Sequence, residues 1–440
     1  MATTVGLISL GCSKNRVDSE QMLAVLKEHG YQIVSDPSRA EVIIVNTCGF
    51  IQSAKEEAIS TLFEMAGYKQ TGCCRLLVAT GCFAQRYPEA IREEMPEVDA
   101  IMGVNDYQKL DQAIQEAAKG GRPVYTDDDG RFHEFGRVLT TPKYSAYIRI
   151  GEGCDNWCSY CAIPMIRGGY RSRTMESIEE EARGLVENGA KELILIAQDT
   201  TRYGIDLYGE YSLAKLMRRL CKIDGLKWLR VLYCYPDALT DELLETMAEE
   251  EKIVKYIDLP LQHASARVLK RMNRTGDRES LTALMKKIRE KIPGVTLRTT
   301  LITGFPGETE EEFTELAEFV KDIEFERLGC FAYSQEEGTP AALLPDQIDD
   351  EVKNHRAEII MESQMNIMDR LGEKQVGRDI TVLTEGFDRY AECWFGRSAM
   401  DAPDIDGKVF FSAETKPYYG EMVTVHVDEA IDGDLFGTRV

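Results

Sequence analysis

Short apolar runs alternate with helical patterns along the first third of the chain. The apolar runs predict strands over Val5–Leu10, Glu41–Asn46, Arg75–Thr80 and Ala100–Gly103. Apolar residues at helical spacing predict helices over Val17–His29, Ser53–Ala66, Gln85–Glu94 and Asp106–Ala118. Strands that alternate with helices favour an α/β fold with a parallel, doubly wound sheet.

A second alternating series follows a polar stretch. Residues 120–143 carry Gly and Pro residues and the acidic run Asp127–Asp129, which is typical of a linker or bridging extension. The next predicted strands are Tyr147–Ile150, Glu192–Ala197, Leu229–Tyr233, Tyr256–Leu259, Thr296–Ile302 and Arg327–Tyr333. The helices predicted between them are Ser177–Asn188, Ser212–Leu220, Asp241–Glu249, Ala266–Met272, Arg278–Lys291 and Glu310–Lys321. This series indicates a partial or whole parallel β/α barrel, in which chemistry occurs at the C-terminal ends of the strands.

The pattern changes again in the last part of the chain. Asp349–Gly372 is one long helical pattern that ends at a glycine. The β-prone runs after it are Asp379–Leu383, Arg389–Cys393, Val409–Phe411 and Glu421–Val427. Gly, Asp and Pro turns separate them, which predicts a small antiparallel β-barrel.

Composition and charge narrow the class of protein. The chain has 440 residues, of which 43% are hydrophobic and 29% charged, so it is neither disordered nor collagen-like. Lys and Arg number 52 against 75 Asp and Glu, and the net charge of −23 suits a basic partner better than nucleic acid. No apolar run approaches the ~18 residues of a membrane helix, and the N-terminus has no basic region typical of a signal peptide. We therefore expect a cytoplasmic protein without membrane contact.

Three of the 12 cysteines lie close together. They form the loop Cys154-Asp-Asn-Trp-Cys158-Ser-Tyr-Cys161, in a glycine-rich turn after the first barrel strand. In a reducing cytosol, clustered cysteines indicate metal or redox chemistry. A structural zinc site takes four ligands, usually as two separated pairs, whereas three thiolates suit an iron–sulfur cube with one open iron. A zinc loop and three packed cysteines are the alternatives.

Cys12, Cys48 and Cys82 each follow a predicted strand of the first domain, beside a glycine. The C-terminal strand ends of an open parallel sheet share one crevice, so these thiols are expected to meet there as a second metal site. The alternative is that they are buried small apolar side chains. The other cysteines are expected in the core or, for an adjacent pair, pointing apart; these are Cys221, Cys234, Cys330, Cys393, Cys73 and Cys74.

The cysteine loop resembles the signature of the radical S-adenosylmethionine (SAM) superfamily, with Tyr160 at the aromatic position before the last cysteine. The resemblance implies a [4Fe-4S] cluster whose open iron binds the amino and carboxylate groups of SAM. It also implies reductive cleavage of SAM to methionine and a 5′-deoxyadenosyl radical, chemistry that the cofactor supplies.

Two further SAM-binding elements of that superfamily are matched in part. Gln198 and Asp199 stand where the superfamily often has a Gly-Gly-Glu turn, which implies contact with the SAM amino group. Gly304 and Gly307, after the fifth strand, would let the backbone approach the adenine, although Thr300 replaces the first glycine of that pattern. An ordinary strand-to-helix turn is the alternative for these glycines.

Nearly the whole chain resembles the methylthiotransferases, which join an N-terminal three-cysteine domain, a radical SAM barrel and a TRAM-type barrel. The resemblance implies a flavodoxin-like domain over residues 1–140, a partial TIM-like radical SAM barrel over 141–372 and a TRAM barrel for substrate recognition over 373–440. It implies two [4Fe-4S] clusters, an auxiliary one on Cys12, Cys48 and Cys82 and the SAM cluster on Cys154, Cys158 and Cys161. No catalytic residue beyond these ligands is assigned.

Methylthiotransferases modify either an adenosine of transfer RNA or an aspartate of a small-subunit ribosomal protein. The runs Ser9–Glu20, Ala197–Gly204 and Leu259–Ser265 resemble the ribosomal-protein branch, whereas the transfer-RNA enzymes typically read Gly-Cys-Gln-Met-Asn at the first cysteine. Residues 373–440 carry seven Lys and Arg against fourteen Asp and Glu, which suits a basic ribosomal protein. Acidity that only keeps the protein soluble is the alternative.

Several assignments stay open from sequence alone. Arg167, Arg171 and Arg173, and the group Arg267, Lys270, Arg271, Arg274 and Arg278, are expected either at the target aspartate, SAM or RNA or on solvated surfaces. His263 is expected either at the site or as a structural histidine. An electron donor such as flavodoxin or ferredoxin is implied, and a monomer is expected. A transfer-RNA methylthiotransferase and a two-cluster electron carrier are the alternative functions.

Overall fold

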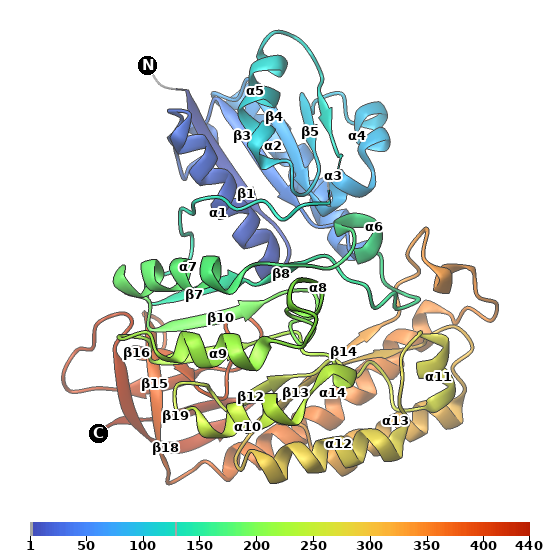
Figure 1. Cartoon of the computed structure of the whole chain (residues 1–440), viewed down its shortest axis with the longest axis vertical. Coiled ribbons are helices and arrows are strands. Elements are labelled where there is room, and N and C mark those ends of the chain that lie inside the picture. The colour runs from blue at the N-terminus through green and yellow to red at the C-terminus, as the bar shows by residue number, and fades with distance from the viewer. Residues whose placement is uncertain (1–2, 128–129) are drawn as a thin grey trace.

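The computed structural model describes residues 3–127 and 130–440, and its N-terminal part is a parallel sheet of order β2-β1-β3-β4-β5-β6 (Figure 1). Its strands are β1 (Thr4–Ser9), β2 (Gln32–Ile33), β3 (Val42–Thr47), β4 (Leu76–Gly81), β5 (Ala100–Met102) and β6 (Val124–Tyr125). Its helices are α1 (Ser13–Glu28), α2 (Gln52–Thr71), α3 (Cys82–Arg86), α4 (Pro88–Glu94) and α5 (Leu110–Ala118). Apolar side chains of α1 and α5 cover one face and those of α2 and α4 the other, which confirms the doubly wound prediction.

Two helix predictions in this domain need correction. Helix α1 begins at Ser13 instead of Val17, because its first turns bury polar side chains, which carry no apolar pattern. The predicted helix Gln85–Glu94 is two helices, since Pro88 lacks an N–H and starts α4 instead of continuing α3. Strands β2 and β6 have two residues each, too few to give a periodic signal.

The predicted linker over residues 120–143 is anchored to its neighbours where it is described; residues 128 and 129 of its acidic run lie outside the described residues. Arg137 is the anchor. Its guanidinium donates to Glu20 Oε2 at 3.1 Å in α1 and to Glu181 Oε1 at 2.5 Å in α7 (Met175–Glu187). It also donates to the Tyr147 carbonyl oxygen at 2.6 Å. This segment therefore joins the N-terminal domain to the barrel.

The middle of the chain is a half barrel of six parallel strands, which confirms the partial-barrel prediction. Two three-stranded sheets, β11-β10-β7 and β12-β13-β14, are joined by a parallel bridge between Leu229 and Ile253. The strands are β7 (Ser145–Arg149), β10 (Glu192–Ile196), β11 (Trp228–Val231), β12 (Tyr256–Asp258), β13 (Thr296–Thr303) and β14 (Arg327–Ala332). The outer helices are α7, α8 (Ile205–Tyr208), α9 (Leu213–Cys221), α10 (Asp241–Glu249), α11 (Ala266–Arg271), α12 (Arg278–Lys291) and α13 (Glu310–Ile323).

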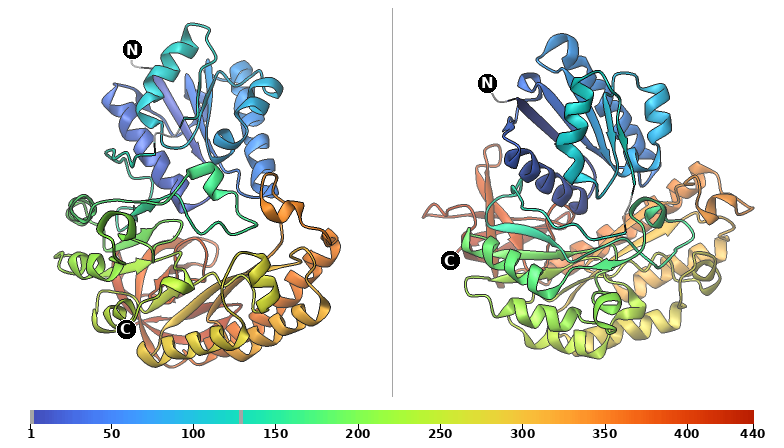
Figure 2. Two further views of the ribbon diagram at one scale, coloured as in Figure 1. Left: turned by 45° about the vertical axis from the view of Figure 1, so that its right-hand side comes forward. Right: turned by 45° about the horizontal axis from the view of Figure 1, so that its top comes forward.

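A short hairpin and one turn of helix lie between β7 and α7. They are β8 (Gly151–Glu152), α6 (Ile163–Arg167) and β9 (Arg171–Ser172). The N-terminal sheet stands above this segment in each view (Figures 1 and 2).

The C-terminal part follows the long helix α14 (Asp350–Glu373) and is a closed five-stranded barrel of order β15-β16-β17-β19-β18. Its strands are β15 (Asp379–Asp388), β16 (Cys393–Ser398), β17 (Val409–Ser412), β18 (Met422–Ile431) and β19 (Asp434–Arg439). The barrel is mixed, not antiparallel, because β17 and β19 run parallel. The predicted strand Arg389–Cys393 is wrong, since those residues form the turn before β16 and only Cys393 belongs to a strand. Strand β19 was not predicted.

The C-terminal barrel closes the inner side of the half barrel. Leu383 and Ala402 pack in one buried cluster with inward side chains of the half barrel such as Ile194. A buried ion-pair group fixes this contact: Glu192 accepts from Arg230 Nε at 2.9 Å and from Arg397 at 2.6 Å. Burial alone would raise the pKa of Glu192, but Arg397 and Arg230 outweigh it and lower the pKa to about 2. The two barrels therefore form one unit.

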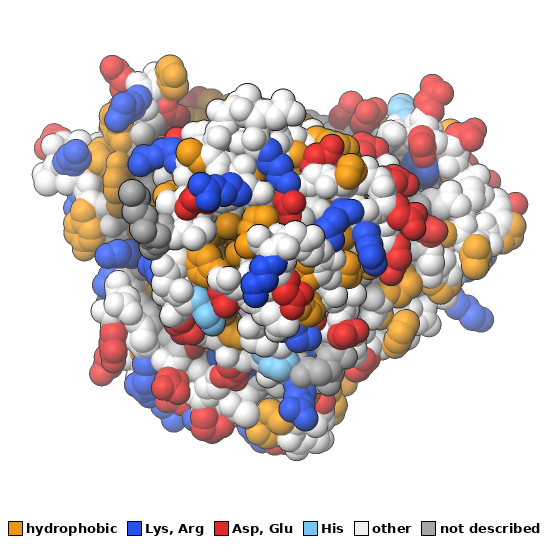
Figure 3. Space-filling model, turned by 90° about the horizontal axis from the view of Figure 1, so that it is seen from above, with side chains coloured by type: hydrophobic (Ala, Val, Ile, Leu, Met, Phe, Trp, Pro, Cys, Tyr) orange, Lys and Arg blue, Asp and Glu red, His pale blue; other side chains and the backbone are white. Residues whose placement is uncertain are grey.

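Charges are mixed on the surface that the N-terminal domain presents. Seen from above, Lys and Arg side chains are interspersed with Asp and Glu and form no continuous basic area on that face (Figure 3). That face therefore lacks the basic stripe typical of nucleic-acid binding. None of the helices in the described part of the chain is long and apolar enough to cross a membrane.

We predict that Glu192→Gln destabilises the protein by roughly 3–5 kcal/mol, because it leaves Arg230 and Arg397 buried without a charged partner. The free Glu pKa is about 4.3 and the folded pKa is lower, so the stabilisation is present above about pH 4.3 and lost as the pH falls towards 2. Denaturant unfolding from about pH 3 to pH 7 measures this, and the variant should show a shallower pH dependence. Glu176→Gln, which removes an exposed ion pair, is the control. Equal losses in both variants would contradict the prediction.

Candidate functional site

The three-cysteine loop lies between β8 and α6, above the C-terminal ends of the barrel strands. The Cys154 N–H donates to the Gly168 carbonyl oxygen at 3.1 Å, and the Cys161 N–H donates to the Cys158 carbonyl oxygen at 3.0 Å. Burial raises the pKa of Cys161 to about 12 and that of Cys154 to about 11, and each thiol also feels the charge of Cys158. The loop thus brings three thiols into one electrostatic neighbourhood, and their role as ligands of a shared centre stays a prediction.

Arg274 lies against this loop instead of on the surface. Its guanidinium is 3.7 Å from Cys158 Sγ and stacks on the Tyr235 ring at 4.2 Å from the ring centroid. Tyr235 Oη is 4.0 Å from the same sulfur. A guanidinium beside a thiolate stabilises its negative charge.

Gln198 and Asp199, the residues predicted to contact SAM, lie beside the loop after β10. Asp199 Oδ2 accepts from Asn156 Nδ2 at 2.8 Å, and Oδ1 accepts from the Thr201 N–H at 3.1 Å. Asp199 therefore holds the cysteine loop through Asn156. Gln198 Nε2 donates to Glu152 Oε1 at 2.8 Å, while its Oε1 is buried without a partner among the described residues. That free acceptor fits a ligand ammonium group.

Tyr160, Gly304 and Gly307 have protein neighbours in this structure. The Tyr160 ring packs beside an apolar cluster that includes Met272 and Phe305. A Cβ on Gly304 would lie 2.0 Å from Lys353 Cγ, and one on Gly307 would lie 2.2 Å from an Arg271 nitrogen. Both glycines have positive φ, so the turn itself needs them. Their contact with the adenine of SAM stays a prediction.

The three N-terminal cysteines follow β1, β3 and β4 at one edge of the sheet. Asn15 joins all three strand ends. Its Nδ2 donates to the Leu10 and Thr47 carbonyl oxygens at 3.0 Å each, and the Cys82 thiol donates to its Oδ1 at 3.6 Å. A Cβ on Gly11 would lie 3.1 Å from Cys48 Sγ, so the Cys12 and Cys48 loops touch there. The fold therefore brings these cysteines together.

Thiol burial differs across this second site. Cys12 is exposed, Cys48 is half-buried and Cys82 is buried. Burial raises the pKa of Cys82 to about 12, and the Arg167 guanidinium, 3.5 Å from its sulfur, opposes that rise. Burial also raises the pKa of Cys48. Binding of a metal centre deprotonates such thiols outright.

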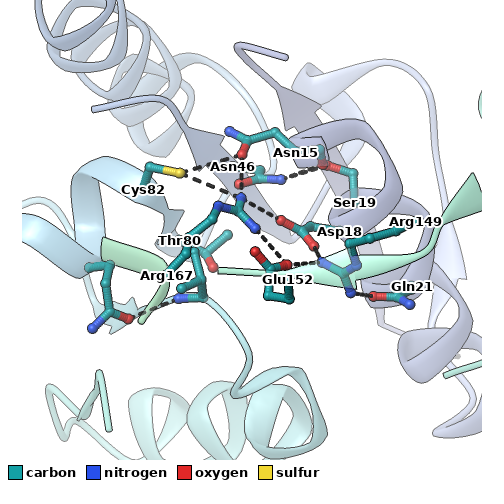
Figure 4. Close-up of polar contacts among 12 residues, drawn as sticks. Asn15, Asp18, Ser19, Gln21, Asn46, Thr80, Cys82, Arg149, Glu152 and Arg167 are labelled. Atoms are coloured by element: carbon teal, nitrogen blue, oxygen red, sulfur yellow. Dashed lines mark hydrogen bonds and ion pairs between the residues drawn. The ribbon is translucent and has the colours of Figure 1, made fainter. Parts of the chain in front are cut away.

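A buried ion-pair network, made of Asp18, Arg149, Glu152 and Arg167, lies beside Cys82 where the N-terminal domain meets the barrel segment (Figure 4). Arg167 donates to Asp18 Oδ2 at 2.8 Å and to Glu152 Oε2 at 3.0 Å. Arg149 donates to Glu152 Oε2 at 2.7 Å and pairs with Asp18. Burial alone would raise the pKa of Glu152, but Arg167 and Arg149 lower it to about 2. Because Asp18 lies on α1 and the other three on the barrel segment, this network locks the two domains together.

The two cysteine groups are the candidate ligand sets for a metal centre. No group of three or more His, Cys, Asp or Glu side chains in the described ranges could hold one metal ion. An iron–sulfur cube places one thiolate on each of several irons, so its cysteines surround a cluster instead of one ion. The remaining cysteines divide as follows: Cys74, Cys221, Cys234 and Cys330 are buried, Cys393 is only half-buried and Cys73 is exposed.

Several of the basic residues left open by the sequence, and His263, have partners within the protein. Arg173 donates to the Arg149 carbonyl oxygen at 3.0 Å, and Arg171 donates to the Arg167 carbonyl oxygen at 3.2 Å, so both brace the hairpin. Arg267 and Arg278 pair with acidic side chains on α13, as expected for a solvated face. His263 is fully buried, accepts from the Ser265 N–H at 3.0 Å and lies 3.3 Å from Glu308, as a structural histidine does.

Sequence reasoning missed the polar side chains that join the sites. Asn15, Asp18 and Glu152 form no motif, because each acts on a partner far away in the chain. The signal that could have found them is the run of polar residues directly after Cys12, where an amphipathic helix would instead place apolar ones.

Three family models match the chain. They are "Uncharacterized protein family UPF0004" over residues 4–103, "Radical SAM superfamily" over 148–320 and "TRAM domain" over 376–440. Among solved structures, TsrM from Kitasatospora setae has a TM-score of 0.58 at 14% identity and covers 86% of this chain and 76% of its own. The cobalamin-dependent radical enzyme OxsB has a TM-score of 0.52 at 12% identity, over 82% of this chain and 56% of its own. These two likenesses show the fold alone.

The fold and the cysteine loop, with the superfamily match, define a radical SAM enzyme. Curated relatives extend the match to nearly the whole chain. The ribosomal protein uS12 methylthiotransferase RimO of Clostridium acetobutylicum is 50% identical over 434 residues, 98% of this chain and 97% of that protein. Those of Clostridium botulinum strain Hall and Clostridium tetani are 49% and 48% identical, each over 98% of this chain and 97% of its own. The chain belongs to the RimO family of radical SAM methylthiotransferases.

We predict that Arg167→Met destabilises the protein by roughly 3–5 kcal/mol, because Asp18 and Glu152 stay buried with one guanidinium fewer. It should also lower the iron retained by the N-terminal cysteines, since Cys82 loses its charged neighbour. Thermal unfolding and iron analysis measure the two effects. Arg183→Met, which removes an ion pair from an exposed arginine, should change stability by at most about 1 kcal/mol. An Arg167→Met protein as stable as this control would contradict the network's role.

Proposed function

We propose that this chain adds a methylthio group to the β-carbon of an aspartate in ribosomal protein uS12. Identity of 48–50% to uS12 methylthiotransferases over 98% of the chain carries the proposal. The facing three-cysteine sites support it, because the reaction needs both a cluster that cleaves SAM and a place that holds sulfur. That β-carbon is unactivated, so acid–base catalysis alone cannot reach it.

At the barrel loop, Cys154, Cys158 and Cys161 would hold a [4Fe-4S] cluster with SAM on its open iron. When bound, this pair supplies reductive SAM cleavage, the chemistry that removes a hydrogen atom from an unactivated carbon. Gln198 Oε1 is free to accept from the SAM amino group, while Asp199 orients the loop through Asn156. Arg274 and Tyr235 lie beside Cys158 and stabilise the charge of its thiolate.

At the N-terminal edge, Cys12, Cys48 and Cys82 would hold the auxiliary cluster and with it the sulfur to be transferred. Asn15 fixes the three loops, and Arg167 reaches Cys82 from the barrel side. The exposed position of Cys12 supports an open approach for the substrate. A second SAM molecule would supply the methyl group as an ordinary electrophile.

We further propose the domain division at residues 140 and 372, with the three matched family regions inside the three units. The C-terminal barrel would recognise basic uS12, although Glu385, Asp401 and Asp406 are paired with arginines or hydroxyl groups inside the protein and do not contribute. We propose that the enzyme acts as a monomer in the cytoplasm and takes electrons from a flavodoxin or ferredoxin. The seven Lys and Arg against fourteen Asp and Glu in residues 373–440 favour a basic protein over transfer RNA as the substrate.

We predict that the anaerobic enzyme with both clusters, SAM and a reductant adds a methylthio group to one aspartate of uS12. Offering uS12 and unmodified transfer RNA together, with mass spectrometry of both, measures this directly. A gain on an adenosine instead would replace the proposed substrate and keep the radical chemistry. SAM turnover without a modified uS12 or transfer RNA would exclude both molecules as the substrate.

We predict that replacing either cysteine triplet removes one cluster, and that the two replacements stop different steps of the reaction. Replacing Cys154, Cys158 and Cys161 with Ala should abolish SAM cleavage and leave about four irons per chain instead of about eight. Replacing Cys12, Cys48 and Cys82 should remove the same amount of iron and stop sulfur transfer. Iron analysis and quantification of 5′-deoxyadenosine measure these outcomes. Replacement of exposed Cys73 is the control. SAM cleavage by the first triplet variant, or transfer by the second, would contradict the assignment.

A further inference from the structure

Lys14 places an ammonium group at the contact between the N-terminal domain and the half barrel. Lys14 follows Cys12 by two residues, on the first turn of α1, and is only 7% exposed. Its Nζ lies 3.1 Å from the centroid of the Tyr233 ring. Tyr233 follows β11 at the C-terminal end of the half barrel, two residues before the Tyr235 that contacts Cys158. Lys14 therefore belongs to the N-terminal site and points onto the barrel site.

This ammonium has no anionic partner in the part of the chain that the structure describes. The buried arginines of the neighbouring network, Arg149 and Arg167, each pair with carboxylates, whereas Lys14 has neither an ion pair nor a hydrogen bond. Most of the Lys14 side chain is buried, and a lysine in such a setting usually has a charged partner. The aromatic face covers only one side of the ammonium, and the other N–H groups still need acceptors.

Tyr233 is held in place by its backbone. Its φ is +61°, a conformation that costs a non-glycine residue energy and is often found at functional sites. Its N–H donates to Asp258 Oδ2 at 2.9 Å, and its carbonyl oxygen accepts from the Thr200 N–H at 3.0 Å. Its hydroxyl lies 3.3 Å from Ser13 Oγ. These contacts fix the ring under Lys14.

We propose that Lys14 binds the side-chain carboxylate of the substrate aspartate, with Tyr233 as the residue that positions it. The proposal rests on the proposed function and names the part of the substrate that the site recognises. In aspartate the β-carbon is bonded directly to the carboxylate carbon, so fixing the carboxylate places the reacting carbon within one bond. Because Lys14 lies beside Cys12, it places that carbon next to the sulfur-bearing site. The substrate carboxylate would be the anionic partner that the Lys14 ammonium does not find within the described part of the protein.

Other cations near the two sites are already engaged. Arg149 and Arg167 each form ion pairs with both Asp18 and Glu152, and Arg274 is stacked on Tyr235 beside Cys158. SAM would be held with the cluster on the barrel loop. We therefore assign Lys14 to the substrate.

Lys14→Met tests this, because methionine keeps the unbranched shape and removes the charge. The KM for uS12 should rise about tenfold to a hundredfold, because the substrate carboxylate loses a charged hydrogen-bond donor. Lys14→Arg should recover part of the loss. Lys27→Met, a change of an exposed lysine on the same helix, is the matched control and should keep the wild-type KM.

A uS12 variant with Asn at the target aspartate separates recognition from a merely structural role. If Lys14 binds the carboxylate, the Asn substrate is poor for the wild-type enzyme, and Lys14→Met causes little further loss. If Lys14→Met raised the KM by the same factor for the Asn substrate as for wild-type uS12, the proposal would be overturned. A wild-type KM for uS12 in Lys14→Met would also overturn it. A rise in the KM for SAM alone would also overturn it and place Lys14 on the SAM carboxylate.

Iron analysis checks that each variant still assembles its clusters, and Lys14→Gln takes the place of Lys14→Met if that protein fails to assemble. The two proposals fail differently. If wild-type enzyme modifies no aspartate of uS12, the proposed function is wrong; if wild-type modifies it and the Lys14 variants do so equally well, only the assignment of Lys14 is wrong.

Discussion

The buried network of Asp18, Arg149, Glu152 and Arg167 is the constraint on which the arrangement of both sites depends. Two carboxylates and two guanidinium groups share one interior, and each makes contacts with the opposite charges (Figure 4). Separating the domains would leave buried charges with fewer partners, which makes any other relative position of the domains costly. Arg167 also contacts Cys82, so the same side chain holds the two domains together and shapes the N-terminal site.

The C-terminal barrel plays a matching part on the other side of the half barrel. An open half barrel leaves inward side chains such as Ile194 and Tyr256 without cover, and the C-terminal barrel supplies it. The ion pairs of Glu192 fix its position. Carboxylates of the C-terminal barrel itself, such as Glu385 and Asp401, also pair with arginines and help to hold the fold together.

Sequence patterns predicted most of the fold and the two cysteine groups. Apolar periodicity found the barrel strands because burial on both faces makes them apolar, and it found α12 over Arg278–Lys291 with the same bounds. It could not find the start of α1, whose buried face is polar, or the parallel pairing of β17 with β19, which depends on how the barrel closes. From the sequence, Arg274 is grouped with basic residues of a solvated helix face, because only the folded chain shows that it stacks on Tyr235. Pairs such as Lys14 and Tyr233 leave no local signal, because their partners are far apart in sequence.

The central claim is that the ionic network holds the two cysteine sites in one fixed relative position. Pulsed electron spin resonance on enzyme with both clusters reduced measures the dipolar coupling between them. The account predicts a single narrow distance distribution in the wild-type enzyme and a broader one in Asp18→Asn, which keeps the size of the side chain and removes its charge. A broad distribution in the wild type, or the same narrow distribution in both proteins, would contradict it.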